Sequence, residues 1–464
     1  MNKQKTLSIS IILLLIISLV AAIISSVHHA GNNNNLQDDR TPAEIYTDAA
    51  NKILQASDLS LSISTAKITT RDGEVYEENS NQTLLYNNIG KETMQAHSRQ
   101  MKSYGNYQIT IQSGYKDSTA FYAITGGNFK CPATSEEYMA TNLPAVLLDA
   151  SLYESIEIEP GSIFSTMTFT KPTAAESWAL PQGGKLIDAS GTAKLSSDGF
   201  LQTVYQLTYQ LNGAKIKEIS RVEANATKPT ITIPNTENYL PVKDINSLLL
   251  MEQSVGYLHQ VNTITATTKQ TIKSEVTGHN WNQESLLYFY DNGNHCTVRQ
   301  DITTKVIDLG SENASAKKTQ SIVFKDGKYT STVDSGKPVE QTGVTDDSMR
   351  TYCRDNLVST ILMSKYITSI TAKETETAIE LSFTANEEMA NSMCQNAWQI
   401  LFGNPDYIRG LTTVSMTGHI TIDKISLLPL KSGVSYDGTY NVSGHNYHLI
   451  FNAEQNYALS DDSN

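Results

Sequence analysis

Two stretches of the sequence have a spacing that can do serine chemistry. Ser64-Thr-Ala-Lys67 places a lysine three residues after a serine, and Lys431-Ser432-Gly433 is similar to the K-T-G element that accompanies such a pair in acyl-transfer sites. That chemistry needs the serine at the start of a helix, with the amine one turn later. Ser64 instead lies in a run of alternating apolar and polar residues, where positions i and i+3 point to opposite faces of a strand. We therefore expect a plain strand at this place.

Two histidine motifs have a spacing that can bind a metal ion. On a helix, His445 and His448 would lie on one face, but their segment falls between strand patterns, where the two rings should diverge. His295-Cys296 has the same weakness. The sequence also lacks an EF-hand spacing, a phosphate-binding glycine loop and a G-x-S-x-G motif. We expect no metal site and no cofactor, and a binding protein in preference to an enzyme.

The composition favours β-sheets that have one face in water. Only 18% of the 464 residues are charged, while tyrosine, valine, isoleucine and threonine are frequent. A net charge of −13 without a basic cluster argues against nucleic acid as a partner. A chain of this length is expected to form two or three domains.

The elements of this chain are organised around a stretch that occurs twice. Asn142–Thr170 returns without a gap as Asn356–Thr384. Both stretches are 29 residues long, and seven positions are identical: Asn142/Asn356, Leu143/Leu357, Leu148/Leu362, Ser155/Ser369, Ile156/Ile370, Phe169/Phe383 and Thr170/Thr384. A period near 210 residues is too long for a solenoid repeat and indicates a duplicated domain.

The first copy is expected to open with a helix over Pro42–Ala56, which a strand then follows. Thr41 with Glu44 three residues later forms a capping box, and proline is favoured at the first helical position. The helical spacing of four apolar residues predicts its buried face: Ile45, Ala49, Ile53 and Leu54. From Leu59 the apolar period changes to two, which indicates a half-buried strand.

A second helix is expected inside each copy. In the first copy it covers Thr134–Ser155 and is interrupted or kinked near Pro144; in the second it starts at Thr345 and continues through Tyr366. A strand that ends in Phe-Thr follows each helix. The order of helix, strands, helix and strands predicts an α+β fold of two tandem modules, each a curved antiparallel sheet, or half-barrel, wrapping its helices.

Matching turns extend the repeat beyond this stretch. Tyr115-Lys116-Asp117 corresponds to Phe324-Lys325-Asp326, and each closes a strand and opens a turn. Gly213 and Gly444 mark the turn before each final strand. The prolines of Lys228–Val242 interrupt regular structure and separate the copies. We therefore expect modules at 41–235 and 236–464, and the second copy's first helix at about Asp244–His259.

The N-terminal residues predict a membrane anchor. Residues 7–27 are uncharged and match the length of about 20 residues that spans a bilayer. Lys3 and Lys5 precede this run, so the positive-inside rule places a short stub in the cytoplasm and the rest of the chain outside. Residues 28–40 indicate a flexible spacer. The alternative is a cleaved signal peptide and a secreted protein.

The four cysteines allow disulfides without requiring them. Cys131, Cys296, Cys353 and Cys394 do not occupy matching positions in the two copies. An even number outside the membrane permits one bridge in the second copy, for which Cys353–Cys394 is favoured, and unbridged thiols are the equal alternative.

The order of elements resembles that of the lipoprotein-carrier superfamily, which includes the LolA/LolB carriers and the LppX/LprG-type lipid-binding lipoproteins. The features that carry this resemblance are the helix inserted midway in each copy and the ending Tyr436-Asp437-Gly438 … Gly444-His-Asn-Tyr447. The chain departs from the family because it lacks a lipobox cysteine and holds the module twice. The resemblance implies a curved sheet that holds a lipid or another apolar ligand beneath a helix.

The apolar stripe of the inserted helix supplies the candidate ligand-binding residues. They are Leu143, Val146, Leu147 and Ala150 in the first copy, and Leu357, Ile361 and Tyr366 in the second. The competing interpretation is that these residues are ordinary core. We expect a membrane-anchored extracytoplasmic binding protein for an apolar ligand, with envelope proteins as further partners. The alternative is a ligand-free structural or protein-interaction module of the cell surface.

Overall fold

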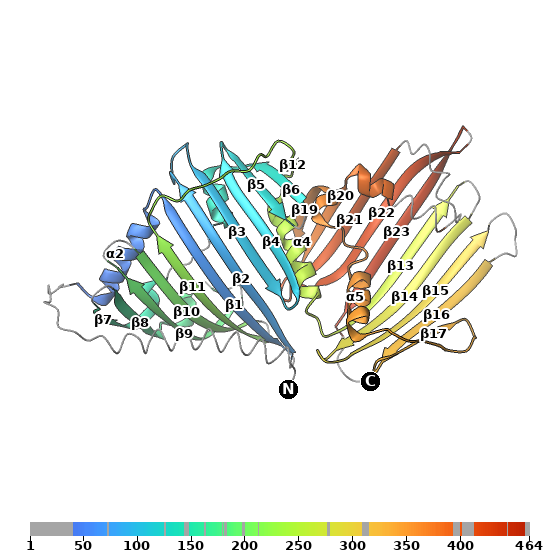
Figure 1. Cartoon of the computed structure of the whole chain (residues 1–464), viewed down its shortest axis with the longest axis horizontal. Coiled ribbons are helices and arrows are strands. Elements are labelled where there is room, and N and C mark those ends of the chain that lie inside the picture. The colour runs from blue at the N-terminus through green and yellow to red at the C-terminus, as the bar shows by residue number, and fades with distance from the viewer. Residues whose placement is uncertain are drawn as a thin grey trace. The chain divides into compact units, whose positions relative to one another are not determined.

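The computed structural model describes residues 40–459 apart from 72–73, 125–126, 143–147, 162–163, 179, 181–182, 197–199, 212, 276–278, 309–314, 393–399, 401–412 and 443. The chain is mostly β, with few helices and two large antiparallel sheets (Figure 1). It divides into two compact units, of which the first ends at Leu240 and the second begins at Pro241.

The first unit holds a sheet of twelve strands, in the order β12-β6-β5-β4-β3-β2-β1-β11-β10-β9-β8-β7. Its strands are β1 (Leu59–Arg71), β2 (Glu74–Asn87), β3 (Gln95–Tyr104), β4 (Tyr107–Lys116), β5 (Thr119–Ile124), β6 (Gly127–Pro132), β7 (Tyr153–Glu159), β8 (Ser165–Pro172), β9 (Lys185–Leu195), β10 (Phe200–Leu211), β11 (Ala214–Asn225) and β12 (Leu240–Pro241). Its helices are α2 (Pro42–Leu54), α3 (Ser135–Asn142), η1 (Ala150–Leu152) and η2 (Ala175–Ser177).

The second unit holds a sheet of eleven strands, in the order β18-β17-β16-β15-β14-β13-β23-β22-β21-β20-β19. Its strands are β13 (Thr263–Ser274), β14 (His279–Asp291), β15 (Cys296–Asp308), β16 (Ser315–Lys325), β17 (Lys328–Val333), β18 (Val339–Gln341), β19 (Ile367–Glu374), β20 (Ala378–Ala385), β21 (Thr413–Asp423), β22 (Pro429–Val442) and β23 (His445–Ala458). Its helices include α4 (Ile245–Leu258), α5 (Asp346–Leu357) and η3 (Ser364–Tyr366).

The two sheets have the same strand order once β12 is set aside, so β1 corresponds to β13 and β11 to β23. The register agrees residue by residue. Phe169 lies opposite Gly191 in the first sheet, and Phe383 lies opposite Gly418 in the second. The gapless repeat therefore reflects a duplicated fold, and two modules are confirmed.

The core of the first unit lies between one face of the sheet and the helices. A row of directly opposed side chains crosses seven strands on this face, and each of them is almost fully buried: Ser113, Ser98, Leu84, Leu61, Ala224, Leu201 and Leu195. Residues directly opposite in antiparallel strands share a face. We call this the inner face of the sheet, and the other the outer face.

The first helix of each unit lies against the late strands of its sheet. Helix α2 contacts β7 and β10, and α4 contacts β19 and β22 (Figure 1). The capping box of α2 is present as predicted, because the Thr41 hydroxyl accepts from Glu44 N–H and the Glu44 carboxylate accepts from Thr41 N–H. Asp244 and His259 cap α4 at the predicted bounds.

The predicted buried face of α2 needs a correction. Tyr46, Ala50 and Ile53 are buried, whereas Leu54 is 62% exposed. The ring of Tyr46 meets that of Phe169 edge-on at 4.9 Å, and this large contact turns the helix toward Tyr46.

The inserted helix is shorter than predicted in both copies. Helix α3 covers only Ser135–Asn142, and Tyr153 to Ser155 already belong to β7. Residues 143–147, which include Pro144, lie outside the described residues, and Leu148 and Asp149 are not helical. Helix α5 begins after its predicted cap at Thr345 but ends at Leu357. Two strands, not one, then lead to the Phe-Thr ending in each unit.

The predicted turns occupy equivalent places. Asp117 and Asp326 follow the strands that end at Lys116 and Lys325, and their φ angles are 50° and 51°. Gly213 and Gly444 have φ angles of 85° and 84°, a conformation that glycine adopts without strain. Each precedes the final strand of its unit, as expected.

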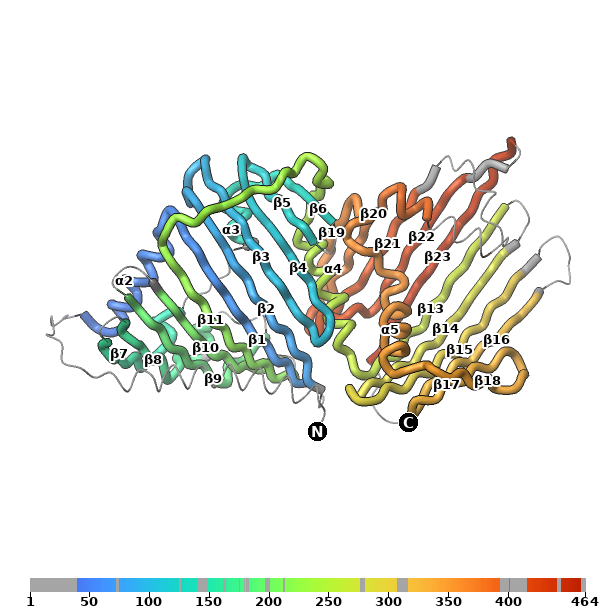
Figure 2. The backbone as a smooth tube through the Cα atoms, viewed as in Figure 1, coloured from blue at the N-terminus to red at the C-terminus, as the bar shows by residue number. Residues whose placement is uncertain are grey.

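The segment 226–240 crosses the outer face of the first sheet (Figure 2). Lys130 Nζ donates to the carbonyl oxygen of Thr236 at 3.1 Å, and the rings of Tyr239 and Phe121 meet edge-on. Phe121 is opposite Gly114, where a Cβ atom would fall 2.0 Å from its ring. This proline-containing segment therefore covers part of the outer face in the first unit.

No helix among the described residues is long and apolar enough to cross a bilayer, and the predicted span at 7–27 lies outside them. Cys394 also lies outside the described residues, so the disulfide between Cys353 and Cys394 remains a prediction. Cys131, Cys296 and Cys353 are buried and form no disulfide with one another.

Candidate functional site

The predicted ligand-binding residues that the structure describes lie in α5, in the turn after it and in two 3₁₀ helices. Ala150 is buried in η1 of the first unit, and Leu357 is buried at the end of α5 in the second. Ile361 and Tyr366 are half-buried in the turn after α5 and in η3. Leu143, Val146 and Leu147 lie outside the described residues. In both units, however, the inserted helix makes polar contacts with the inner face of the sheet.

One tyrosine of the inserted helix reaches the inner face in both units. The Tyr138 hydroxyl bonds the hydroxyl of Ser113 on β4 at 3.0 Å, and the Tyr352 hydroxyl donates to the Gln300 amide oxygen on β15. Tyr138 and Tyr352 occupy the same place in the repeat, 214 residues apart. Burial raises the pKa of both phenols, so each stays protonated and can donate.

The sheet residues beneath these tyrosines change together between the units. Gln82 on β2 donates to Ser98 on β3, at 3.2 Å. At the equivalent places the types are exchanged, and Gln300 on β15 donates to Ser285 on β14, at 2.8 Å. Both units therefore have a hydrogen bond from a glutamine amide to a serine hydroxyl, but the glutamine and the serine stand on exchanged strands. Since a buried polar group needs its partner, replacing one residue of the pair requires replacing the other.

The inner face of the first unit changes from apolar to charged along β1. Leu59, Leu61 and Ile63 are buried, while Lys67, on the same face, is only half-buried. Lys67 lies directly opposite Glu78 on one side and Glu218 on the other.

Two neighbours complete this charged end of the inner face. Lys102 Nζ lies 3.5 Å from a Glu78 carboxylate oxygen, and their side chains are 21% and 13% exposed. The Tyr205 hydroxyl donates to Glu218 at 3.3 Å. We call Lys67, Glu78, Lys102, Tyr205 and Glu218 the charged trough. Its two cations and two anions balance, and it continues directly from the apolar core.

One buried hydroxyl beneath the inserted helix has no partner among the described residues. Tyr86 is fully buried on the inner face, near Tyr122, yet no hydrogen bond to its hydroxyl is present. Burial raises the pKa of this phenol. Buried tyrosine hydroxyls usually find a partner, so this place suits a water molecule or a polar group of a ligand.

The second unit has an apolar cluster where the first has its charged trough. Ile272 corresponds to Lys67 and lies directly opposite Trp281 and Phe451, which correspond to Glu78 and Glu218. All three are at most 8% exposed. Phe289, the counterpart of Tyr86, carries no hydroxyl. The inner face of the second unit is thus closed by packing at both of these places.

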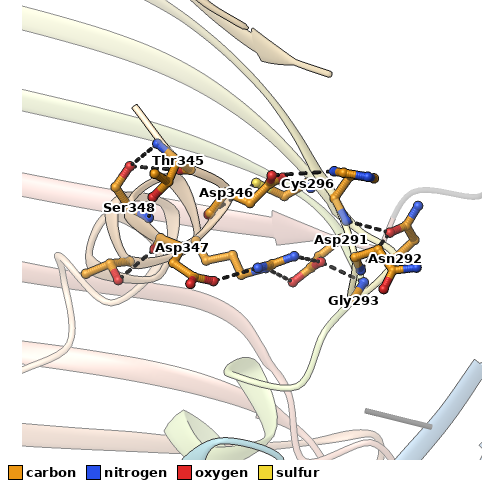
Figure 3. A network of polar contacts seen from close by, with 12 residues as sticks. Asp291, Asn292, Gly293, Cys296, Thr345, Asp346, Asp347 and Ser348 are labelled. Carbon is orange, nitrogen blue, oxygen red and sulfur yellow. Dashed lines mark hydrogen bonds and ion pairs between the residues drawn. The ribbon is translucent and has the colours of Figure 1, made fainter. Parts of the chain in front are cut away.

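A polar clamp joins α5 to the β14–β15 hairpin in the second unit (Figure 3). Arg350 donates from Nε and Nη2 to the two carboxylate oxygens of Asp291, at 2.8 and 3.0 Å, and from Nη1 to Asp347 at 2.8 Å. These bonds to Asp291 raise the pKa of the guanidinium. The Arg350 and Asp291 side chains are 14% and 11% exposed, so the ion pair is largely removed from water.

The start of α5 adds a second contact to this hairpin. Cys296 N–H donates to Asp346 at 2.6 Å (Figure 3). Burial alone would raise the pKa of Asp346, but the bonds from Cys296 and His295 outweigh it and lower the pKa. Burial and the neighbouring Asp346 raise the pKa of the Cys296 thiol to about 12, so it is an unreactive thiol near neutral pH. This arrangement orients a helix and offers no nucleophile.

Two further buried polar contacts fasten the second unit internally. Ser364 in η3 donates to Glu252 of α4, a carboxyl group that is 4% exposed. The hydroxyls of Thr360 and Ser432 bond one another, and Thr360 also donates to Gln455 at 3.2 Å. At the place of Ser364, the first unit has Ala150.

The serine and histidine motifs carry no catalytic geometry. Ser64 lies in β1 as predicted and donates to Asn81 on the outer face, while Lys67 belongs to the inner face. His448 pairs with Asp437 on the neighbouring strand. Among the described residues, no group of three histidine, cysteine or acidic side chains is placed to hold a metal ion.

Sequence reasoning missed the charged trough, although β1 carried a signal for it. The alternating positions Leu59, Leu61 and Ile63 continue through Thr65 to Lys67 without a change of period. A lysine that keeps the parity of the apolar residues belongs to the helix-facing side of the strand. Its partners Glu78 and Glu218 emerge only from the strand pairing.

No protein-family model and no curated protein matches this chain. Among solved structures, LprF from Mycobacterium bovis is similar over 48% of this chain and 99% of its own, with 6% identity and a TM-score of 0.24. A DUF3598-family protein of unknown function from Nostoc punctiforme PCC 73102 covers 90% of this chain and 99% of its own, with 9% identity and a TM-score of 0.14. At scores this low the likeness supports no conclusion about function, which has to be inferred from the residues of this chain.

Proposed function

We propose that this chain is a membrane-anchored extracytoplasmic binding protein, and that its first unit holds an amphipathic ligand against the inner face. In this proposal the first sheet acts as a half-barrel around its helices. The observation that carries it is the charged trough, which continues the apolar face of β1 at a place where the second unit has Ile272, Trp281 and Phe451.

The trough has the chemistry for a polar head group. Half-buried charges are costly unless they are paired or hydrogen-bonded, and Lys67, Lys102, Glu78 and Glu218 offer both donors and acceptors to a ligand. The adjoining Leu61 and Ile63 present apolar surface to a tail. A ligand with one apolar and one polar end matches this gradient, whereas a purely polar ligand would leave the apolar part unused.

The tyrosines beneath α3 supply a second polar point of attachment. The unpartnered hydroxyl of Tyr86 lies in the same buried layer as Tyr138, whose own hydroxyl bonds Ser113. A polar group of the ligand that accepts from Tyr86 would supply the missing hydrogen bond, which contributes about 1 kcal/mol.

The second unit favours a structural role within the same protein. Its inner face is closed by packed aromatic rings, and the Arg350–Asp291 clamp holds its inserted helix in place. We propose that it contributes rigidity to the chain. No catalytic step and no cofactor belong to this proposal.

Native mass spectrometry of the full chain tests the proposal. The chain is purified in mild detergent and exchanged into volatile buffer, and one bound amphipathic molecule per chain is the expected result. A fluorescent fatty acid serves as the added probe. The double variant Lys67→Ala with Glu218→Gln should bind it at least about tenfold more weakly, since about 1.4 kcal/mol of head-group contact is lost.

The matched control is Lys217→Ala, because Lys217 is the neighbour of Glu218 on the outer face of β11. This variant should bind the probe as the parent does. A chain that carries no co-purified molecule and does not take up the probe would contradict the binding proposal. Equal weakening by both variants would place the ligand elsewhere.

The anchor is tested separately from the ligand. Edman sequencing of the membrane-associated protein should find Met1 or Asn2 at the N-terminus, and protease added outside the cell should digest the region after residue 40. A mature N-terminus at Gly31 would show that residues 1–30 are a cleaved signal, and the protein would then be secreted.

A further inference from the structure

The outer face of the second sheet carries a groove of about 670 Å³ on the side away from the helices. Strands β19 to β23 and β13 contribute its lining. The floor of the groove is formed by Phe383, Val434 and Ala453, whose side chains lie on the buried inner face. The neighbouring positions on each strand, such as Thr417, Ser435 and Asn452, supply its walls.

Gly433 of β22 makes room for the ring of His419, which lines the groove. A Cβ atom on Gly433 would fall 2.6 Å from Cε1 of His419, so the imidazole lies directly over the glycine. The same place in the first unit has Val204 opposite Thr192. Valine there would fill the hollow and displace the ring, so the first unit does not share this geometry.

The groove is rich in hydroxyls and its charges are paired. Seven of its fifteen lining residues are serine or threonine, and a hydroxyl can both donate and accept. Glu454 pairs with Lys431 at 3.1 Å, and Lys269 pairs with Glu284 at 3.5 Å. Among the described residues of this lining, no uncompensated charge remains to attract a phosphate or a carboxylate.

The imidazole of His419 adds a neutral donor and a neutral acceptor. Burial and the neighbouring Lys431 lower the pKa of His419, while Glu454 acts in the opposite direction to a smaller extent. The ring is therefore uncharged near neutral pH, and each nitrogen plays one role in hydrogen bonding.

We propose that this groove binds a neutral polyhydroxylated ligand, namely a segment of a carbohydrate chain. The alternation of donors and acceptors on such a ligand matches the serine, threonine and asparagine side chains across six neighbouring strands. The described side chains of the groove walls form no apolar tract, so the groove differs in chemistry from the trough of the first unit. The groove is also independent of the proposed function, since it lies in the other unit and on the other face.

The same lining predicts how the ligand is held. Among the described lining residues the one aromatic ring apart from His419 is that of Phe383, which points to the inner face, so stacking on a sugar ring is not available there. Each sugar then contributes only a few exposed hydrogen bonds, which are individually weak. Binding should therefore rise with chain length, and oligosaccharides should bind at least tenfold better than single sugars.

The test uses the full chain with neutral oligosaccharides and with insoluble polysaccharides. Chitin and cellulose are offered in sedimentation assays, and chito- and cello-oligosaccharides of increasing length in NMR titrations. The double variant Thr417→Val with Ser435→Ala removes two groove hydroxyls at little change in volume. It should weaken retention by the preferred polysaccharide at least tenfold.

The matched control is Ser190→Ala with Gln206→Ala, at the equivalent outer positions of the first unit. It should retain the polysaccharide as the parent does, and thermal unfolding should show both variants folded. A second variant, Gly433→Val, should also abolish retention by filling the hollow. Retention by none of the polysaccharides, or equal loss in groove and control variants, would overturn the inference, while uptake of the fatty acid probe reports separately on the first unit.

Discussion

The two units use one topology but close their inner faces differently. The first places Lys67 between Glu78 and Glu218, and the second places Ile272 between Trp281 and Phe451. Apart from β12, the strand order is shared. The strand pairing therefore determines where a site can form. A few side chains on the inner face then determine whether that place is polar or part of the apolar core.

The outer faces of the two sheets also differ. In the first unit the segment 226–240 covers part of the outer face, with Tyr239 on Phe121. In the second unit Gly433 and His419 shape a polar groove on that face. The two units therefore differ on both faces, and substitutions at equivalent positions should have unequal effects.

The largest effect is expected when the charged residue of one unit is placed in the other. Ile272→Lys should destabilise the second unit by about 4 kcal/mol, because a fully buried amine must give up its charge or remain unpaired. The reverse change, Lys67→Ile, should cost less than about 1 kcal/mol, since Glu78 keeps Lys102. Hydrogen exchange resolved by peptide measures the stability of each unit, and equal costs would refute the difference between the two faces.

The next effect concerns the clamp on α5. Arg350→Ala should destabilise the second unit by about 3 kcal/mol, because Asp291 is left largely buried without its cation. The control is Arg221→Ala in the first unit, whose exposed pair with Glu223 contributes less than about 1 kcal/mol. Denaturant unfolding of each variant gives the comparison. A clamp variant no weaker than the control would mean that α5 is held by its apolar contacts alone.

Acid should weaken the second unit through His259. Burial, with Arg354 nearby, lowers the pKa of His259 to about 4, so in the folded state the ring stays neutral where the unfolded chain already binds a proton. Stability is therefore lost as the pH falls from about 6.5 to about 4, by about 2 kcal/mol at pH 5.

The variant His259→Gln should flatten this dependence in the second unit and leave the first unchanged. Exchange rates of amides in α4 and β13 between pH 7 and pH 5, corrected for intrinsic exchange, provide the measurement. An unchanged pH dependence in the variant would assign the acid sensitivity to other groups. One such group in the same unit is His419, whose pKa is also lowered.

The smallest effect tests the unpartnered phenol. Tyr86→Phe reproduces the residue of the second unit and should stabilise the ligand-free first unit by about 1 kcal/mol, because it removes a buried hydroxyl without a partner. Thermal unfolding of delipidated protein gives this value. Destabilisation by a similar amount would show that an ordered water or a neighbouring group already satisfies the hydroxyl.

Much of the architecture was predictable because its signals are local. The Thr41–Glu44 capping box, the bounds of α4 and the turns at Gly213 and Gly444 each depend on a few adjacent residues. The length of the inserted helix was predicted wrongly, because an apolar stripe continues through the turn after α5 and through η3 at spacings that a helix also produces.

The candidate sites were less predictable than the fold. Lys67 and Glu218 are 151 residues apart in the sequence, and His419 meets Gly433 only across a strand pair. Neither pair forms a motif, since a sheet brings together residues at separations that depend on every turn between them. The predicted stripe of Leu357, Ile361 and Tyr366 is spread over a helix, a turn and a 3₁₀ turn.

The sequence by itself determined the turns, the helix starts and the apolar alternation of the strands, because each depends on a few adjacent residues. It also determined the duplication, because the two copies repeat one pattern of residues. The tertiary structure alone decided which residues face one another across the sheet, and therefore that Lys67 joins two carboxylates while Ile272 joins two aromatic rings. The physical reason is register: pairing in an antiparallel sheet aligns side chains on one face, and no local pattern carries that alignment.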